Sequence, residues 1–233
     1  MKTTRNKKLA SGPKRVRGVA YARGVEARER IILAALAIFG AEGFEGASTR
    51  VVSKRANVAL PALQYYFGGK EGLYLECARH IAEKMKAALD PALARIAPMI
   101  EPSAKTTRRQ AVAALQVLMD QIIDMLVGSS QAEPWVMFII REQANPTSAF
   151  DLLYSEAIGR VAHACTALVS KALGKSTADP EVRVRGFAVL GQLIAFRAAH
   201  AAALRSLRWP NLEGERLAII KSALRAHTRA ALR

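Results

Sequence analysis

Apolar side chains recur at spacings of three and four residues through most of this chain, which is the period of an amphipathic helix. Runs of β-branched residues long enough for strands are few, and alanine and leucine supply most of the apolar content. The pattern predicts an all-α protein. Its first helix begins at Glu26, should end near the glycines at 40–43, and has an apolar face made by Ile31, Leu33, Ala34, Ile38 and Phe39.

Prolines, glycines and polar clusters divide the rest of the chain into further helices. Ser48 or Thr49 is a suitable cap for the next one. The helix that opens at Lys70 should stop before Pro91, because the residue before a proline avoids the helical region. The predicted helices after the first cover about residues 48–55, 60–67, 70–90, 92–100, 106–127, 131–144, 147–173, 180–206 and 212–232.

The helices at 48–55 and 60–67 are joined by a turn of three residues, Ala56–Val58. Asn57 lies where a left-handed backbone is needed, and asparagine accepts that conformation better than most residues. Pro61 suits the first turn of the second helix, where its missing N–H costs nothing. Two helices joined in this way, with a supporting helix before them, are typical of a helix-turn-helix DNA-binding unit.

The second of these helices presents two different faces. Leu63 and Phe67 lie on one side, where they can pack on the first helix. The other side carries groups suited to DNA, since glutamine pairs with adenine edges, while tyrosine hydroxyls and a lysine at a helix N-terminus contact phosphates. Alternatively, the aromatic triplet at 65–67 is simply a plug in the core. The candidate DNA contacts here are Leu60, Pro61, Gln64, Tyr65, Tyr66 and Lys70.

The charge of the chain favours a polyanionic partner. It carries 35 Lys and Arg against 19 Asp and Glu, a net charge of +16, which indicates nucleic acid first and an acidic membrane surface second. Residues 1–24 are predicted to be a disordered basic arm, because residues 1–25 hold eight Lys or Arg and no acid. This arm is either a solvated tail or a DNA-binding arm whose Arg15, Arg17 and Arg23 follow the backbone or enter the minor groove.

Several classes of function have no support in the sequence. Cys77 and Cys165 are far apart and form no CxxC pair, which favours a reducing compartment. No uncharged apolar run reaches membrane-spanning length and no secretory signal is recognisable, so we expect a cytoplasmic protein. The four histidines form no metal-ligand set, and no nucleotide-binding or hydrolase motif occurs. We therefore expect no enzyme, no metal and no cofactor.

The segment FEGASTRVVSKRANVALPALQYYFGGKEGLY resembles the N-terminal helix-turn-helix of the TetR/AcrR family of bacterial transcriptional regulators, over about residues 25–75. WVMFIIREQANPTSAFDLLY and GQLIAFRAAHAAALRSLRW further resemble the CecR-like subgroup, whose C-terminal domain is all-helical. The resemblance implies a homodimer that places one recognition helix of each subunit in a major groove of a palindromic operator, with a guanine as a partner for Arg50. The positions that it assigns to DNA are Thr49, Arg50, Leu60, Pro61, Ala62, Tyr65, Tyr66 and Lys70.

Three residues depart from the family pattern. Asn57 replaces the usual turn glycine, which asparagine can accommodate. Ala59 replaces a common Ser or Thr cap, so we expect the recognition helix to lack a side-chain cap. Gln64 stands where the family often has tyrosine, which leaves either a phosphate or a base as its partner.

The late helices carry two apolar stripes, on which the resemblance places the four-helix bundle of the dimer. Alternatively, both stripes are core within one subunit. The small residues Gly186 and Gly191 would allow close helix packing. The stripe in 147–173 consists of Phe150, Leu153, Ala157, Val161, Ala164 and Leu168, and the stripe in 180–206 of Phe187, Leu190, Ile194, Ala198 and Ala201.

A regulator of the family that the chain resembles also needs an effector cavity among its middle helices. Apolar and aromatic side chains with a few polar ones suit such a cavity. Each candidate is otherwise plain core, a surface group or a member of an ion pair. The candidates are Met99, Met119, Trp135, Phe138, Arg141, Tyr154 and Gln192.

The sequence thus predicts a disordered arm over 1–24, a helix-turn-helix domain over 25–72 and a helical ligand-binding and dimerisation domain over 73–233. The expected function is sequence-specific regulation of transcription by a homodimeric repressor that a small apolar or amphipathic effector releases. The first alternative is a protein that coats nucleic acid without sequence preference through its charge. The others are a membrane-surface protein, and a lipid carrier or enzyme with a vestigial helix-turn-helix.

Overall fold

The computed structural model describes the backbone over residues 14–128 and 133–233, and the side chains over 24–128 and 134–233. Every regular element in these ranges is helical, as the sequence predicts. A π-helical turn, Tyr154–Ile158, separates α7 from α8. The α-helices are α1 (Lys14–Gly46), α2 (Thr49–Ala56), α3 (Leu60–Phe67), α4 (Lys70–Ile100), α5 (Arg108–Val127), α6 (Glu133–Ala144), α7 (Ser148–Leu153), α8 (Gly159–Leu173), α9 (Pro180–Ala198), α10 (His200–Leu207) and α11 (Glu215–Ala231).

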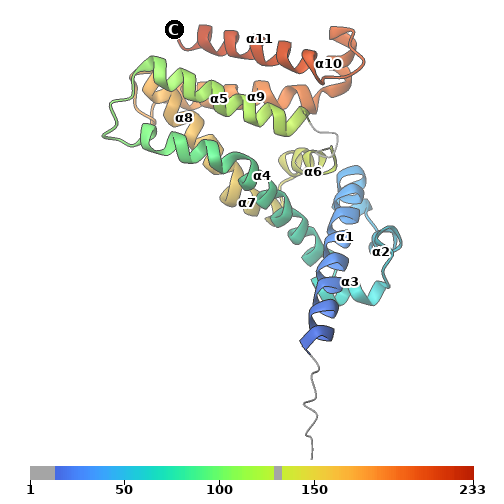
Figure 1. Cartoon of the computed structure of the whole chain (residues 1–233). Helices are drawn as coiled ribbons and strands as arrows, with labels where there is room; N and C mark the ends of the chain where they lie inside the picture. The colour runs from blue at the N-terminus through green and yellow to red at the C-terminus, as the bar shows by residue number, and fades with distance from the viewer. Residues whose placement is uncertain (1–13, 129–132) are drawn as a thin grey trace, which may run out of the picture.

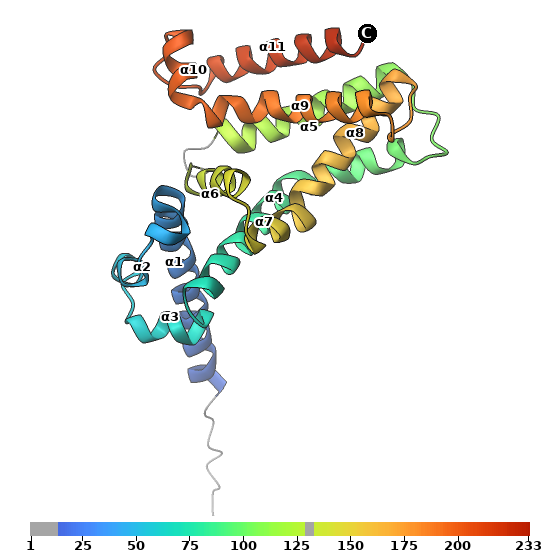
Figure 2. The same cartoon turned by 180° about the vertical axis from the view of Figure 1, so that it is seen from behind.

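The helices form two bodies that α4 connects (Figure 1). α1, α2 and α3 pack together at one end, and α4 runs from them into the C-terminal body, which contains α5, α8, α9 and α11. Seen from behind, α8 and α9 lie on the outside of that body (Figure 2). α6 lies in the corner between α1 and the C-terminal body, and it packs chiefly on α1.

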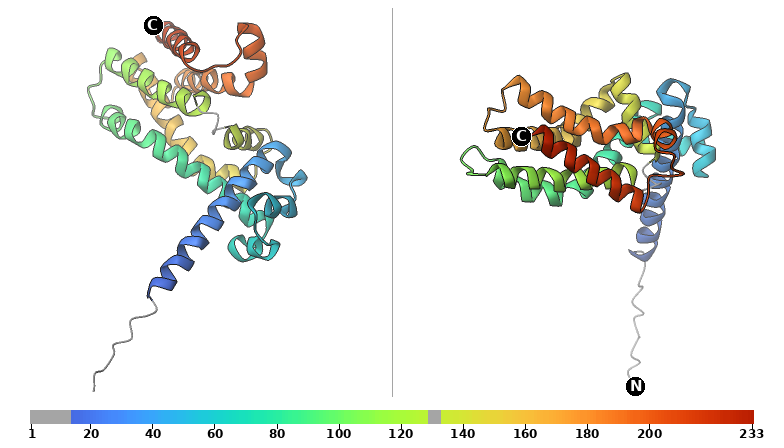
Figure 3. Two further views of the ribbon diagram at one scale, coloured as in Figure 1. Left: turned by 45° about the vertical axis from the view of Figure 1, so that its right-hand side comes forward. Right: turned by 90° about the horizontal axis from the view of Figure 1, so that it is seen from above.

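α1 is longer than the sequence predicts. It begins at Lys14 instead of Glu26, so the backbone of residues 14–24 is helical where a disordered arm was expected. Arginine and alanine favour a helix, and no proline interrupts this stretch. Its first turns extend beyond α3 (Figure 3). The rest of the expected arm, 1–13, lies outside the described residues. Near the predicted end, Gly43 breaks the helix with a φ of 76°.

Three further boundaries differ from the prediction. α4 continues through Pro91 and Pro98 instead of stopping before the first of them. An internal proline costs a helix about 3 kcal/mol, but the buried residues on either side hold this stretch in the core of the C-terminal body. The predicted helix at 147–173 contains the π-helical turn, and the predicted helix at 180–206 bends by 82° between α9 and α10.

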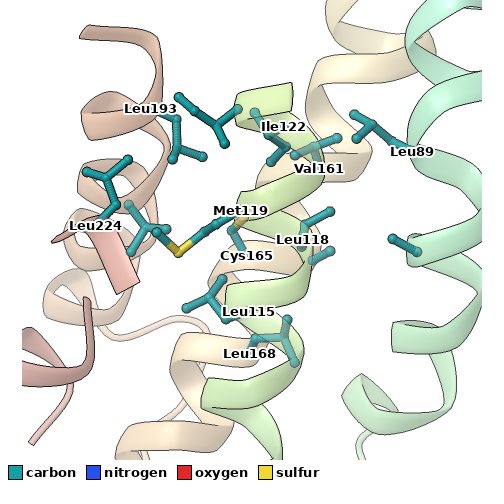
Figure 4. Packing of buried hydrophobic residues seen from close by; sticks show 14 of the residues in the cluster. Leu89, Leu115, Leu118, Met119, Ile122, Val161, Cys165, Leu168, Leu193 and Leu224 are labelled. Atoms are coloured by element: carbon teal, nitrogen blue, oxygen red, sulfur yellow. The ribbon is translucent and has the colours of Figure 1, made fainter. Parts of the chain in front are cut away.

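Two clusters of buried side chains make the core, and they meet within α4. One cluster joins α4 from Leu89 onward to α5, α8, α9 and α11 (Figure 4). The other holds α1, α2, α3 and the part of α4 between Leu73 and Met85, and it also includes Phe138 of α6 and Leu153 of α7. Residues from beyond the helix-turn-helix therefore complete its core.

α5 is the central helix of the C-terminal body. Its N-terminus is closed by a capping box between Thr107 and Gln110. Leu115, Leu118 and Ile123 are buried against its neighbours α4, α8 and α9. Considered as a single segment, α5 is the one described helix that is long and apolar enough to span a membrane. Its packing accounts for that composition, because a helix surrounded by others needs apolar residues on most sides.

Candidate nucleic-acid interface and internal cavity

The turn between α2 and α3 has the geometry that its residues predict. Asn57 adopts a left-handed conformation with φ 53° and ψ 52°, and its N–H donates to carbonyls at the end of α2. Pro61 lies in the first turn of α3, and Gly68 ends that helix with a φ of 70°. Ala59 at the N-cap provides no side-chain hydrogen bond, as expected. Backbone preferences at these few positions shape the turn and fix both ends of α3.

α3 has one buried face and one exposed face. Leu63 and Phe67 are 2% and 8% exposed and pack in the core with α1. On the opposite face, Tyr65 is 84% exposed and Leu60 is 41% exposed. The aromatic triplet therefore divides, with Phe67 in the core, Tyr66 half-buried and Tyr65 on the surface. The exposed face of α3 has the width and the side chains that a DNA major groove accepts.

The other predicted DNA contacts lie around this face and differ in how far they are exposed. Arg50 and Gln64 are exposed, although the Gln64 amide donates to the Gly68 carbonyl at 3.1 Å. Lys70 is half-buried, with its ammonium 4.6 Å from the ring centroid of Phe44. Pro61 is exposed, and the half-buried positions also include Thr49, Ala62 and Tyr66.

α2 exposes further groups that the sequence analysis did not single out. Val51 is 48% exposed, and Lys54 and Arg55 are exposed as well. Arg50 and Lys54 are four residues apart, so they lie on the same face of the helix. The helical period therefore predicts from the sequence that Lys54 lies on the same exposed face of α2 as Arg50.

The junction between α3 and α4 depends on a glycine inside α4. Gly69, just before the helix, has a φ of 131°. Gly72, in the first turn of α4, faces the end of α3 so closely that a Cβ there would lie 1.8 Å from the carbonyl oxygen of Phe67. Only glycine fits this position. The sequence indicated the turn at Gly68 and Gly69, but no local pattern distinguished Gly72.

α6 is held against α1 by backbone contact and by an arginine. The Arg141 Nε donates to the carbonyl of Gly40 at 2.8 Å, and the same guanidinium donates to the carbonyl of Ala41. A Cβ on Gly40 would lie 2.6 Å from the carbonyl oxygen of Pro134, so the two helices touch through their backbones. Arg141 thus satisfies carbonyls near the end of α1, in contrast to its predicted place in a cavity.

A buried polar network lies behind this contact. The Glu142 side chain is 2% exposed and accepts hydrogen bonds from the Tyr74 hydroxyl at 2.6 Å, the Thr147 hydroxyl at 2.9 Å and the Thr147 amide at 3.1 Å. Burial, followed by the bond to Glu142, raises the pKa of Tyr74. One carboxylate therefore joins α4, α6 and the start of α7, and the three helices must move together or break buried hydrogen bonds.

A cavity of about 80 Å³ lies between α4, α5, α6, α8, α9 and the π-helical turn. Two of its lining side chains are polar, Gln143 and Arg197. Such a lining suits an organic molecule that is largely apolar. The other twelve residues are aliphatic or thioether side chains: Met85, Leu89, Ile122, Met125, Leu126, Val136, Ile139, Ile140, Ile158, Val161, Leu190 and Ile194.

The seven residues predicted for an effector cavity are not brought together around this one. Met119 and Gln192 instead contact Thr228 of α11, at 3.5 and 2.8 Å. Met119 lies in the core of the C-terminal body (Figure 4). Phe138 packs on Tyr74 with a centroid distance of 4.4 Å. Arg141 contacts α1. Met99 and Trp135 are half-buried. Tyr154 lines a groove of about 680 Å³ between α4 and α8.

An apolar face of α9 is exposed to solvent. Phe187 is 75% exposed and Val184 is 67% exposed. Ala188, Ala195 and Ala198 are exposed on the same face, at helical spacings from them. Contiguous exposed apolar patches are typical of interaction surfaces.

The two predicted stripes of the late helices divide differently. All but Phe150 of the first stripe is buried within the protomer, and Leu190 and Ile194 of the second line the cavity. Gly186 is also used internally, because a Cβ there would lie 2.7 Å from the hydroxyl of Thr166 on α8. Of the second stripe, Phe187 and Ala198 of α9 and Ala201 of α10 remain exposed.

No metal-binding group appears among the described residues. No cluster of three or more His, Cys, Asp or Glu side chains in the described ranges could hold an ion. Cys77 and Cys165 are both buried and free. Burial raises the pKa of the Cys165 thiol to about 12, so this thiol stays protonated and unreactive at neutral pH.

Comparison with known families and proteins gives two matched regions. The family of bacterial regulatory proteins called the tetR family matches residues 31–77, which contain the helix-turn-helix. The C-terminal domain of the HTH-type transcriptional dual regulator CecR matches residues 111–233. The regulator CecR of Shigella flexneri is 29% identical over 88% of this chain and 91% of its own length. A probable HTH-type transcriptional regulator, YttP of Bacillus subtilis (strain 168), is 28% identical over 51% of each chain.

Solved structures with this fold are also regulators. A transcriptional regulator from Rhodococcus sp. Rha1 has a TM-score of 0.57 and 19% identity, covering 87% of this chain and 94% of its own. AibR, in complex with isovaleryl coenzyme A and operator DNA, has a TM-score of 0.61 and 16% identity, covering 85% and 96%. At these identities the likeness concerns the fold.

Proposed function

This chain belongs to the TetR family of bacterial regulators, in the group that carries the CecR-type C-terminal domain, and on that premise we propose that it is a homodimeric repressor. It binds a palindromic operator in the cytoplasm and leaves it when a small molecule occupies the C-terminal body. The exposed face of α3 carries this proposal, because Tyr65 and Leu60 are exposed to solvent there while the opposite face is core.

The second subunit would cover the exposed face of α9. A two-fold axis brings the same patch of each protomer together, so Phe187 and Val184 would each occur twice in the interface. α8 and α9 lie together on the outside of the C-terminal body, away from α2 and α3 (Figure 2). A dimer built on them leaves both recognition helices free. Their separation must then match half-sites about 34 Å apart or a multiple of this distance.

Release from DNA would pass through α6. Val136, Ile139 and Ile140 line the cavity, and the same helix holds α1 through Arg141 and α4 through Glu142. A molecule that enlarges the cavity displaces α6 and with it the helices that position α3. The complex of AibR with isovaleryl coenzyme A and operator DNA supports the idea that this fold can combine an organic ligand with DNA. An effector shifts the equilibrium only as far as it binds the two conformations unequally.

The proposal is tested by fluorescence anisotropy with DNA from upstream of the protein's own gene, at physiological salt and against excess scrambled DNA. We expect binding that resists the competitor, with two protomers per site. A protein that merely coats nucleic acid through its +16 charge would be displaced, because non-specific binding rests on phosphate contacts that every sequence offers. If selection from a random DNA library also returned no palindrome, the coating function would replace the regulator.

Replacing Arg50 with alanine should weaken operator binding by roughly 1–3 kcal/mol, or about five- to 150-fold, because the variant lacks the guanidinium that an exposed arginine at the start of α2 offers to a base or phosphate. The same anisotropy assay measures the change. Arg205→Ala removes an equal charge from an exposed position on α10 and serves as the control. An equal weakening by both variants would mean that only overall charge matters.

Deleting residues 1–22 should reduce the salt dependence of operator binding. The deletion removes seven Lys or Arg residues. Each phosphate contact that is lost makes the slope of log K against log [salt] less steep by about 0.9. The first turns of α1 extend past α3 (Figure 3), and we propose that the residues removed by the deletion contact DNA beside the operator. The measurement is a titration at several salt concentrations. An unchanged slope would show that the arm makes no DNA contact.

A further inference from the structure

We propose that the protein recognises its operator through thymine methyl groups, which the apolar first turn of α3 contacts in the major groove. This inference rests on the proposed function, because it specifies which chemical group of the operator the recognition helix reads. Leu60 makes the contact and Pro61 extends it. The partner is therefore duplex DNA with a thymine at a fixed position in each half-site.

The first turn of α3 is apolar at every position. Its four successive side chains, counted from the N-cap, offer neither a donor nor an acceptor of hydrogen bonds: Ala59, Leu60, Pro61 and Ala62. Leu60 is 41% exposed, and Ala59 and Pro61 are exposed as well. An apolar surface is thus presented at the start of the helix that the proposed function places in the groove.

The backbone of this turn is poorly suited to a phosphate. Pro61 has no N–H, and the N–H of Ala62 already donates to the carbonyl of Ala59 at 2.9 Å. The N-cap residue provides no side-chain hydrogen bond either. Because a helix N-terminus binds phosphate through its free N–H groups, the start of α3 is better suited to base edges than to the DNA backbone.

Base edges in the major groove offer one methyl group. All four bases present hydrogen-bond donors or acceptors there, and thymine adds the methyl group on its C5. In helix-turn-helix proteins the N-terminal residues of the recognition helix contact base edges, and Leu60 and Pro61 occupy these positions in α3. An apolar side chain gains free energy by removing a methyl group from water. The first turn should therefore prefer thymine.

Gln64 is the polar residue one turn further along α3, and it points away from this turn. Its amide nitrogen donates to the carbonyl of Gly68 at 3.1 Å. Its amide oxygen lies 3.6 Å from the position that a Cβ on Gly69 would take. Recognition of adenine by glutamine needs the nitrogen and the oxygen together at the base edge. In this conformation Gln64 is directed toward the C-terminal end of the helix, and the apolar first turn remains to read the bases.

Replacing thymine with uracil tests the proposal, because uracil lacks the methyl group and keeps the same base pairing. Each thymine of the operator obtained by selection would be replaced in both half-sites, and binding of the full-length protein measured by anisotropy at physiological salt. At one position at least, we expect binding to weaken roughly fourfold per half-site and roughly fifteenfold for both, as burial of one methyl group predicts. An operator without any such position would overturn the proposal.

Variants of Leu60 identify the side chain that contacts the methyl group. In Leu60→Ala the uracil effect at this position should fall below about twofold, since the two changes remove the same contact. Leu60→Met should retain the effect, because an unbranched methionine can make the same contact. Leu33→Ala is the control, as Leu33 is 52% exposed on α1, and it should leave the effect unchanged. A full uracil effect in Leu60→Ala would overturn the assignment to Leu60.

A methyl group on another base gives a second test. At the sensitive position the T·A pair would be replaced with C·G, with and without a methyl group on the cytosine C5. We expect this methyl group to strengthen binding of the wild type roughly fourfold per half-site and to have no effect on Leu60→Ala. An equal response of the two proteins would contradict the proposal.

These measurements separate the inference from the proposed function. Selection of an operator comes first and does not depend on the modified bases. If a palindromic operator is bound but uracil has no effect at any position, recognition of thymine is wrong and the regulator remains. If no operator is selected, the proposed function fails and this inference fails with it.

Discussion

Replacing Phe187 with glutamate is expected to convert the protein from a dimer to a monomer and to weaken operator binding by a factor of about 10² to 10⁴. Phe187 is 75% exposed in the protomer, and the proposed interface buries it. Burying an unpaired carboxylate costs several kcal/mol, and two-fold symmetry applies that cost twice. A monomer then binds each half-site separately and lacks the gain that joining two binding sites provides, which is typically 10² to 10⁴.

Light scattering and anisotropy measure the two effects. The monomer mass is 25.2 kDa. The wild type should have about twice this mass in solution, and the variant should have the monomer mass. Ile219→Glu is the matched control, since Ile219 is also an exposed apolar residue, 56% exposed on α11, but lies outside the α9 face. A variant that stays dimeric with glutamate at 187 would show that the protomers meet through another surface.

Replacing Gly72 with alanine is expected to destabilise the protein by roughly 3 kcal/mol and to abolish operator binding, because an overpacked position has to be relieved by backbone movement. The new methyl group would overlap the carbonyl oxygen of Phe67, which lies 1.8 Å from its position. α3 must move away from α4 to make room, so the recognition helix changes its orientation. Denaturation in urea and the operator assay measure the two effects.

Gly68→Ala is the comparison that identifies the cause. Gly68 has a φ of 70° but no atom within 4 Å of its missing Cβ, so alanine there meets only the strain of a left-handed backbone, roughly 1 kcal/mol. We expect this variant to fold and to retain most of its DNA binding. If Gly72→Ala destabilised the protein no more than Gly68→Ala does, the close approach of Gly72 to Phe67 would not have the expected effect.

The helix-turn-helix could be predicted almost residue by residue because local chemistry determines it. Asn57 in the turn, Pro61 at the start of α3 and Gly68 at its end each have a backbone preference that their neighbours do not override. The division of the aromatic triplet into a buried Phe67 and an exposed Tyr65 follows from helical period alone. The residues that contact DNA remain predictions, and the exposed positions among them are where such contacts can form.

The C-terminal body was harder to predict because contacts between distant segments decide it. The period identified apolar faces correctly, but several faces of each helix are apolar, and only packing shows which of them line a cavity. Met119 and Phe138 are core residues for this reason. Arg141 had no local signal for its role, because its acceptors lie one hundred residues earlier in the chain, in α1. Pro91 misled for the opposite reason, since the burial of its neighbours Leu89 and Ala92 outweighs the local preference of the proline.

The shared core of the N-terminal body limits how this protein can be recombined with others. Phe138, Ile139 and Leu153 belong to the same buried cluster as α1, α2 and α3, so cutting the chain after residue 72 would expose apolar surface on both pieces. A chimaera that joins these three helices to a foreign ligand-binding domain would have to bring α6 and α7 with it, or supply replacements of equal shape. The unit of exchange between regulators of this design is therefore discontinuous in sequence, and α6 and α7 belong to it as much as the recognition helix does.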